Sequence, residues 1–81
     1  MSQDSRIKAE FGNAMRKYRH AAGISQEALA NLAGIHRTYV GDVERGERNL
    51  SLLNMVRLSA ALGVRLSQVI LEMERKLGHK A

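Results

Sequence analysis

Glycines divide this chain into short segments of helical periodicity. Five of the seven glycines, at positions 23, 34, 46, 63 and 78, close stretches in which apolar residues recur every three or four positions. That recurrence is typical of amphipathic helices, and glycine often follows the last turn of a helix. Proline is absent and aromatic residues are few, which disfavours a β-rich fold. The sequence therefore predicts an all-α fold with five helices, forming one domain over residues 1–81.

The expected helices lie between those glycines. Asp4 or Ser5 caps the first helix, which ends at about Ala22. Gly12 lies inside this helix at a cost of about 1 kcal/mol relative to alanine, and a closely approaching backbone would explain its presence. The remaining helices are expected at about 25–33, 37–45, 51–62 and 65–78.

Positive charge dominates the composition, with a formal net charge of +5. A basic domain of this size suits a polyanionic partner such as DNA, RNA or an anionic membrane surface. However, no apolar run approaches the roughly 18 residues of a membrane span, and the N-terminal MSQDSRIKAE lacks the apolar segment of a signal peptide. We therefore expect a cytoplasmic protein that does not associate with membranes.

Metal-binding and catalytic motifs are not evident in the sequence. The absence of cysteine excludes disulfides and cysteine-ligated zinc, and His20 and His79 have no carboxylate at ligand spacing. The chain also has no Ser–His–acid set at helical neighbour positions and no glycine loop that would cradle phosphate. We therefore expect no metal site, no cofactor, no small-molecule ligand and no enzymatic activity.

Residues 25–49 contain two short amphipathic helices separated by the break Gly34-Ile35-His36. This is the helix-turn-helix layout, at about 25–45, in which the second helix (the recognition helix) lies in the major groove of DNA. Val40 and Val43 share one face of that helix and pack back on the first, so the other face points outward. An ordinary helical hairpin would explain the apolar spacing, but not an outward face built from Arg37, Thr38, Gly41, Asp42 and Arg45.

Five positions in this stretch resemble the signature of the Cro/repressor-type (XRE) helix-turn-helix family. They are followed by TYVGDVERGERN, which is similar to the TYxxxxERG-type segment of that family, especially in controller proteins of restriction–modification systems. The resemblance covers roughly residues 11–70. It implies a lambda-repressor-like fold and a sequence-specific DNA-binding transcriptional regulator. The five positions are Gln26, Ala30, Gly34, Val40 and Val43.

Base reading is expected from the start of the recognition helix. Arg37 can make a bidentate contact with guanine, and Thr38 can touch a thymine methyl or bond a base edge. Asp42 can accept a hydrogen bond from cytosine, or it can pair with Arg45 inside the helix. Tyr39 can bond a phosphate, stack on a base step or cover the core.

Contacts with the DNA backbone are expected around this face. Gln26 stands at a helix N-terminus, where free N–H groups favour phosphate, although it can instead help to cap the helix. His36 is either a weak cap or a pH-sensitive phosphate contact, and Gly41 would let the helix approach DNA closely. The resemblance implies that Arg48 and Asn49 contact phosphate or a groove edge. The predicted backbone contacts are Gln26, His36, Gly41, Arg45, Arg48, Asn49, Arg16 and Lys17.

The resemblance also implies a structural ion pair between Arg19 of the first helix and Glu44 of the recognition helix. If this pair is buried, removal of one partner should cost about 3–5 kcal/mol because a lone charge remains in the interior.

The last helix, at about 65–78, carries more apolar surface than a small domain needs. We expect a symmetric homodimer through this helix, with help from the end of the fourth, because no other domain follows. Such a dimer would hold its recognition helices about one DNA turn apart, roughly 34 Å, on a near-palindromic operator. The apolar stripe of this helix consists of Leu66, Val69, Ile70, Met73 and Leu77. Alternatively, this stripe closes the core of the monomer. Core side chains of the fourth helix are expected to be Leu52, Leu53, Val56, Leu58, Ala60 and Leu62.

A second class of function stays open. Antitoxin-like modules share this fold and act mainly by binding a partner protein, and a stoichiometric partner in purified material would favour that reading. For a regulator, the predicted partners are double-stranded DNA, a second copy of the chain and, as a further candidate, RNA polymerase.

Overall fold

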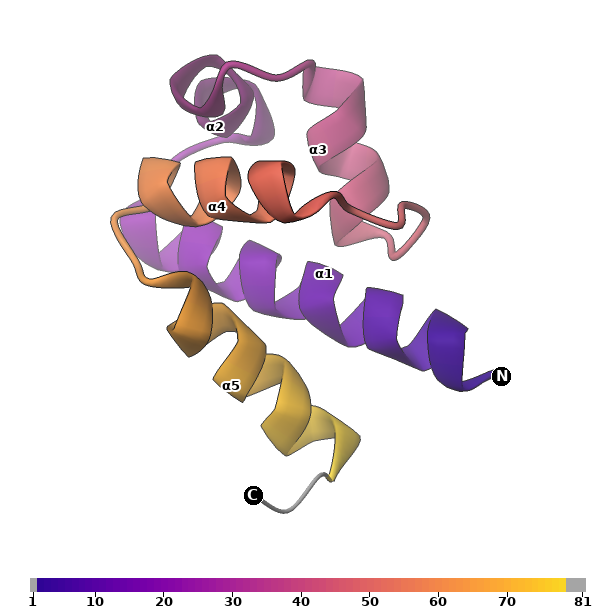
Figure 1. The fold of residues 1–81 in the computed structure, drawn as a ribbon. Helices are drawn as coiled ribbons and strands as arrows, with labels where there is room; N and C mark the ends of the chain where they lie inside the picture. Colours follow the sequence, from indigo (N-terminus) through magenta and orange to yellow (C-terminus); the bar gives the residue numbers. More distant parts are fainter. Residues whose placement is uncertain (1, 79–81) are drawn as a thin grey trace.

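The computed structural model describes residues 2–78, and within this range it contains five α-helices and no strand. The prediction of an all-α, five-helix fold is confirmed. In Figure 1, α1 runs through the middle of the molecule, with α2 and α3 on one side and α5 on the other, while α4 packs against α2 and α5. The helices are α1 (Gln3–Ala22), α2 (Gln26–Ala33), α3 (Arg37–Glu44), α4 (Leu52–Ala61) and α5 (Leu66–Leu77).

Serine hydroxyls cap three of the helices. Ser25 accepts a hydrogen bond from the backbone N–H of Ala28 at 3.0 Å, and Ser51 accepts one from Asn54 at 3.1 Å. At the N-terminus the predicted cap was wrong. Ser2 caps α1 by accepting from the backbone N–H of Ser5 at 3.1 Å, so Asp4 and Ser5 lie inside the first turn. A carboxylate in that turn is favourable because it faces the unpaired N–H groups of the helix end.

One hydrophobic core joins all five helices. Its most deeply buried members are at most 1% exposed and come from every helix in turn. Burial of each such side chain contributes about 1.5–3 kcal/mol, so the small core depends on all five helices being in place. These residues are Met15 of α1, Leu29 of α2, Val40 and Val43 of α3, Leu58 of α4 and Val69 of α5.

The outer face of α4 differs from the prediction. Leu58 and Leu62 are buried as expected, but Leu52, Leu53 and Val56 are 65%, 68% and 49% exposed. Because α4 packs through the side that carries Leu58 and Leu62, residues on its far side face solvent. The expectation that those three residues, and the exposed Ala60, belong to the core was wrong.

The apolar stripe of α5 packs on the core of its own chain. Val69 is 0% exposed and Leu77 is 9% exposed, and the three other stripe residues pack against the same core. Val69 has no exposed surface with which to contact a second subunit, whereas Leu77 keeps a small exposed area, and its predicted place in a dimer interface stays a prediction. The other three residues, Leu66, Ile70 and Met73, are partly buried.

Gly12 marks the point where α1 and α3 approach most closely. A Cβ atom at this position would lie 2.8 Å from the carbonyl oxygen of Glu44, and still closer to that of Val43. The close backbone that the sequence suggested is therefore the C-terminal end of the recognition helix. Gly12 thereby sets the distance between the long central helix and α3.

We expect Gly12→Ala to lower the free energy of unfolding by about 1–3 kcal/mol, because the added methyl group would push two backbone segments apart. Gly41 of α3 gives a matched comparison, since a Cβ there would meet the flexible end of Arg45 at 3.1 Å. Gly41→Ala should therefore be neutral or stabilising by up to about 1 kcal/mol. Urea denaturation of both variants tests this, and equal losses would contradict it.

Candidate nucleic-acid interface

The turn between α2 and α3 is built from backbone and capping contacts. Gly34 adopts a left-handed φ of 71°, and the N–H of Ile35 donates to the carbonyl of Ala30 at 3.0 Å. His36 then caps α3, because its Nδ1 accepts from the backbone N–H of Thr38 at 3.2 Å. Only an unprotonated Nδ1 can accept this bond, so the cap needs a neutral imidazole. Of the two alternatives for His36, the structure shows the weak helix cap.

Five of the predicted DNA contacts gather around one shallow hollow of about 230 Å³ between α2 and α3. Arg37 and Thr38 stand at its rim at the start of α3, and both side chains are exposed. Among residues 2–78, Arg37 has no ion-pair partner, which leaves its guanidinium available. The hollow is lined by Gln26, Arg37, Thr38, Gly41 and Arg45.

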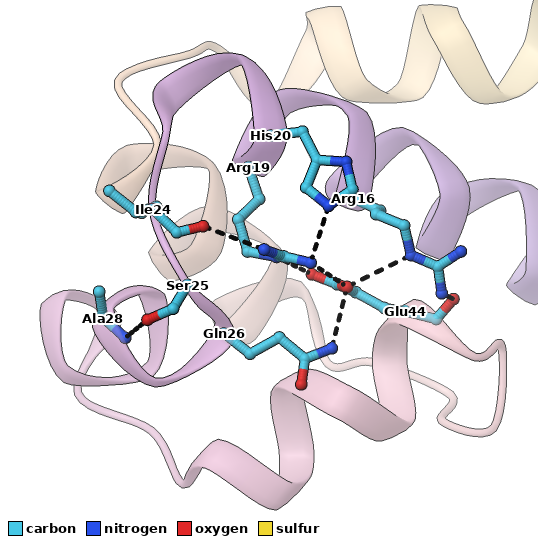
Figure 2. A network of polar contacts seen from close by, with 8 residues as sticks. All are labelled: Arg16, Arg19, His20, Ile24, Ser25, Gln26, Ala28 and Glu44. Atoms are coloured by element: carbon cyan, nitrogen blue, oxygen red, sulfur yellow. Dashed lines mark hydrogen bonds and ion pairs between the residues drawn. The ribbon is translucent and has the colours of Figure 1, made fainter.

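Behind the hollow, the buried carboxylate of Glu44 is the centre of a polar network (Figure 2). Arg19 donates from Nε to Oε2 at 2.6 Å and from Nη2 to Oε1 at 2.9 Å. Its third contact, from Nη1 to the carbonyl of Ile24 at 3.0 Å, reaches the segment that leads into α2. The pair that the resemblance implied is therefore formed, and it joins α1 to the end of α3.

Gln26 and Arg16 belong to the same network. Gln26 donates from Nε2 to Oε1 of Glu44 at 3.1 Å, which links the start of α2 to α3. Arg16 lies 3.4 Å from that oxygen and donates from Nη2 to the main-chain carbonyl of Glu44 at 3.2 Å. Arg16, predicted to bind phosphate, thus covers the C-terminal end of α3, where free carbonyls attract a cation. Arg16 is therefore engaged by Glu44 in the structure, and its contact with phosphate stays a prediction.

The environment of Glu44 acts on its ionisation in two opposed ways. Burial raises the pKa of its carboxyl group, whereas hydrogen bonds from Arg19, Gln26 and Arg16 and the charge of Arg19 lower it, and the net pKa lies below the ordinary 4.5. The hydrogen bond to Glu44 likewise raises the pKa of Arg19. Glu44 is therefore ionised in the folded protein at neutral pH.

Lys17, a predicted phosphate contact, pairs with an acid of α5 in the structure, and its contact with phosphate stays a prediction. Its Nζ lies 3.0 Å from Oε1 of Glu72, a residue of α5. In Figure 1, α5 packs on the side of α1 opposite to α2 and α3, so Lys17 points away from the recognition helix. The buried Glu72, which also lies 3.7 Å from Arg75, is a structural acid that the sequence analysis missed.

Asp42 holds two cations at the outer end of α3. Arg45 lies 2.5 Å from one of its oxygens and Arg48 3.1 Å from the other. The guanidinium of Arg48 is also 5.0 Å from the centre of the Tyr39 ring, and the Tyr39 side chain itself is partly buried against the core. Of the alternatives for Asp42, the structure therefore shows the ion pair with Arg45 inside the protein. Tyr39 covers the core in the free protein.

Asn49 lies apart from this group. It lines a hollow of about 290 Å³ beside the first turns of α1, together with Asp4, Ile7 and Lys8. The side chain is exposed, so a phosphate contact there would involve the edge of the molecule and not the hollow between α2 and α3. Lys8 lies beside Asn49 in this hollow, and Lys8 and Arg48 both line a neighbouring hollow with it.

The described part of the chain offers neither a metal site nor a membrane span. Within residues 2–78, no three histidine, cysteine, aspartate or glutamate side chains gather in a way that could hold a metal ion. His79 lies outside the described residues. None of the five helices is long and apolar enough to cross a lipid bilayer.

Replacement of Glu44 by glutamine should lower the free energy of unfolding by about 3–5 kcal/mol at neutral pH, because Arg19 keeps its charge without a carboxylate. Since the pKa of Glu44 is depressed below 4.5, its stabilisation is complete above that value and is lost as the pH falls through the lower, folded-state pKa. The difference in the free energy of unfolding between wild type and variant should therefore become smaller in acid. Urea denaturation between about pH 7 and about pH 3 measures it.

Glu10→Gln is the matched control, because Glu10 undergoes the same chemical change on the surface of α1, where it bonds only Asn13 among the described residues. It should change stability by less than about 0.5 kcal/mol. A similarly small loss in Glu44→Gln, or a loss that does not vary with pH, would contradict the role assigned to Glu44.

Comparison with known proteins agrees with this geometry. Residues 15–69 match the helix-turn-helix family. Control protein C.MunI from Mycoplasma sp is 39% identical over 71 residues, covering 86% of this chain and 96% of the relative. Control protein C.BamHI from Bacillus amyloliquefaciens is 48% identical over 59 residues, covering 72% of this chain and 73% of the relative. The crystal structure of the restriction-modification controller protein C.AhdI from Aeromonas hydrophila is 48% identical, with a TM-score of 0.74, covering 75% of this chain and 92% of that one. The chain belongs to the Cro/repressor-type (XRE) helix-turn-helix family.

Proposed function

We propose that this chain is a controller protein of a restriction–modification system that binds a specific DNA site with α3 in the major groove. As a member of its family, the chain is a DNA-binding transcriptional regulator. The observation that best supports the proposal is the hollow between α2 and α3, with Arg37 and Thr38 exposed at its rim. Relatives that are 39% and 48% identical carry the name control protein, which supports the narrower assignment.

In this proposal, α2 positions the protein and α3 reads the sequence. The N-terminus of α2 offers unpaired N–H groups to a phosphate, and Gln26 is held there by Glu44. With its amide nitrogen engaged by Glu44, Gln26 keeps its oxygen and its backbone N–H as free groups. Arg37 pairs with guanine and Thr38 meets a neighbouring base edge, so sequence preference comes from these two side chains.

We further propose that the chain acts as a homodimer on a near-palindromic operator, with α4 as the contact surface in place of α5. Leu52 lies three positions before Met55 and four before Val56, so these side chains are neighbours on α4. Met55 also lines an apolar groove of about 180 Å³ with Phe11, Ile70 and Met73. We call the apolar surface of Leu52, Leu53, Met55 and Val56 the α4 surface, and Met55 connects it to this groove.

A second copy is the occupant that the DNA-binding function favours. A single short recognition helix reads few base pairs, whereas two related by symmetry read two half-sites about one turn apart. Contiguous exposed apolar side chains are typical of interaction surfaces. An antitoxin-like role would use the same surface for a different protein, and the dimer measurement below distinguishes the two. No described contact bears on RNA polymerase, which stays a predicted partner.

Arg37→Ala should weaken binding to the preferred operator by about 1–3 kcal/mol and relax selection at one base position, because one bidentate contact is lost. Arg37 is exposed and unpaired within the described residues, so thermal stability should not change. Binding is measured by fluorescence anisotropy on operator and random duplexes. An equal loss on both would mean that Arg37 contacts only phosphate.

Leu53→Glu should convert the dimer to a monomer, because a charge would be buried in the α4 surface. Sedimentation equilibrium over a range of protein concentrations measures this. Leu71→Glu is the comparison, since Leu71 is a 56% exposed leucine on α5. If Leu71→Glu abolishes the dimer and Leu53→Glu does not, the interface belongs to α5. A wild-type mass that stays monomeric at all concentrations would remove the dimer proposal.

A further inference from the structure

We propose that Asp42 is a specificity-determining residue, which acts by holding Arg45 and Arg48 in fixed positions and thereby weakens binding to DNA of random sequence. This inference rests on the proposed DNA-binding role of α3. It does not require Asp42 to touch a base.

The cations around α3 are not equally available. Asp42 uses one carboxylate oxygen for Arg45, at 2.5 Å, and the other for Arg48, at 3.1 Å. Glu47 adds a second contact to Arg45 at 3.2 Å. Arg37 has no such partner among residues 2–78. Two of the three arginines between positions 37 and 48 are thus already paired with carboxylates before DNA arrives.

The pairs also fix where the two guanidinium groups lie. Arg48 is held between Asp42 and the face of the Tyr39 ring, 5.0 Å from the ring centre. Arg45 is held along the last turn of α3, where its Nη1 lies close to Gly41 at the hollow. The Asp42 side chain is 18% exposed, whereas those of Arg45 and Arg48 are 54% and 48% exposed, so the acid is partly enclosed by the two cations that it holds. Fixed cations contact phosphates only when α3 sits in one register on the duplex.

This arrangement separates specific from random binding. On an operator, the base contacts of Arg37 and Thr38 set the register in which the held arginines meet phosphates. On random DNA there are no such base contacts, and binding depends on cations that can adapt to whichever phosphates are near. A carboxylate that restrains two arginines therefore costs more affinity on random DNA than on the operator.

Asp42→Asn tests the inference, because it keeps the shape of the side chain and removes its charge. One freed phosphate contact raises affinity about fivefold at about 0.15 M salt and steepens the salt dependence by about 0.9. We expect a rise of at least this size on random duplexes, a steeper salt slope there, and less than about a twofold change on the operator. The ratio of operator affinity to random-DNA affinity should therefore fall by about 2.5-fold or more.

Glu27→Gln is the charge-matched control. Glu27 is an exposed acid in the first turn of α2, close to the same face, with no ion pair among the described residues. It should raise affinity on both duplexes by a similar factor and leave their ratio unchanged. As a second test, Asp42→Asn made in an Arg45→Gln/Arg48→Gln background should no longer change the ratio, because the cations that Asp42 restrains are absent.

Each remaining outcome overturns the inference. Equal gains on both duplexes would mean that Asp42 acts only through net charge. A loss on the operator with no change on random DNA would make Asp42 a base-reading residue. Either result leaves the proposed function intact, whereas a wild-type protein that never distinguishes operator from random DNA would refute the proposed function itself.

Discussion

The buried carboxylate of Glu44 is the interaction on which the geometry of the DNA-facing side depends. It accepts hydrogen bonds from Arg19 of α1 and Gln26 of α2, while its own backbone ends the recognition helix (Figure 2). One residue therefore connects all three helices that must keep their relative positions on DNA. Because a buried charge without partners is costly, each partner stabilises this arrangement more than a surface contact would. The contact at Gly12 acts on the same point, since its lack of a side chain lets the end of α3 rest directly on α1.

The polar groups around α3 fall into an inner and an outer set. The inner set, centred on Glu44, fixes the recognition helix to the fold. The outer set, centred on Asp42, holds Arg45 and Arg48 on the surface. Arg37 and Thr38 belong to neither set, and they are the side chains most available for base contacts. A net charge of +5 draws the protein to DNA, but much of the positive charge near α3 is already paired, so selectivity must depend on a few contacts.

Local signals predicted the helices well because they act over short distances. Glycines at the ends of the five periodic segments all adopt a positive φ, and the expected helices at about 25–33 and 51–62 begin at the serine caps Ser25 and Ser51. The side of a helix that faces the core was harder to predict. In α4, leucine, valine and methionine surround the helix, so periodicity alone did not reveal that Leu52, Leu53 and Val56 face solvent. The ion pairs of Lys17 and Arg16 were not predicted for a related reason, since their partners Glu72 and Glu44 lie far away in the sequence.

Sequence reading by α3 is tested by selection of bound duplexes from a random library at about 150 mM salt, an ionic strength at which nonspecific electrostatic attraction is largely screened. We expect enrichment of one motif with two-fold symmetry and half-site centres about 10 base pairs apart, or a multiple of that spacing. Enrichment of a single half-site would retain the recognition helix and reject the dimer. Binding without any enriched motif would contradict sequence-specific recognition, because α3 would then contact DNA without reading its sequence.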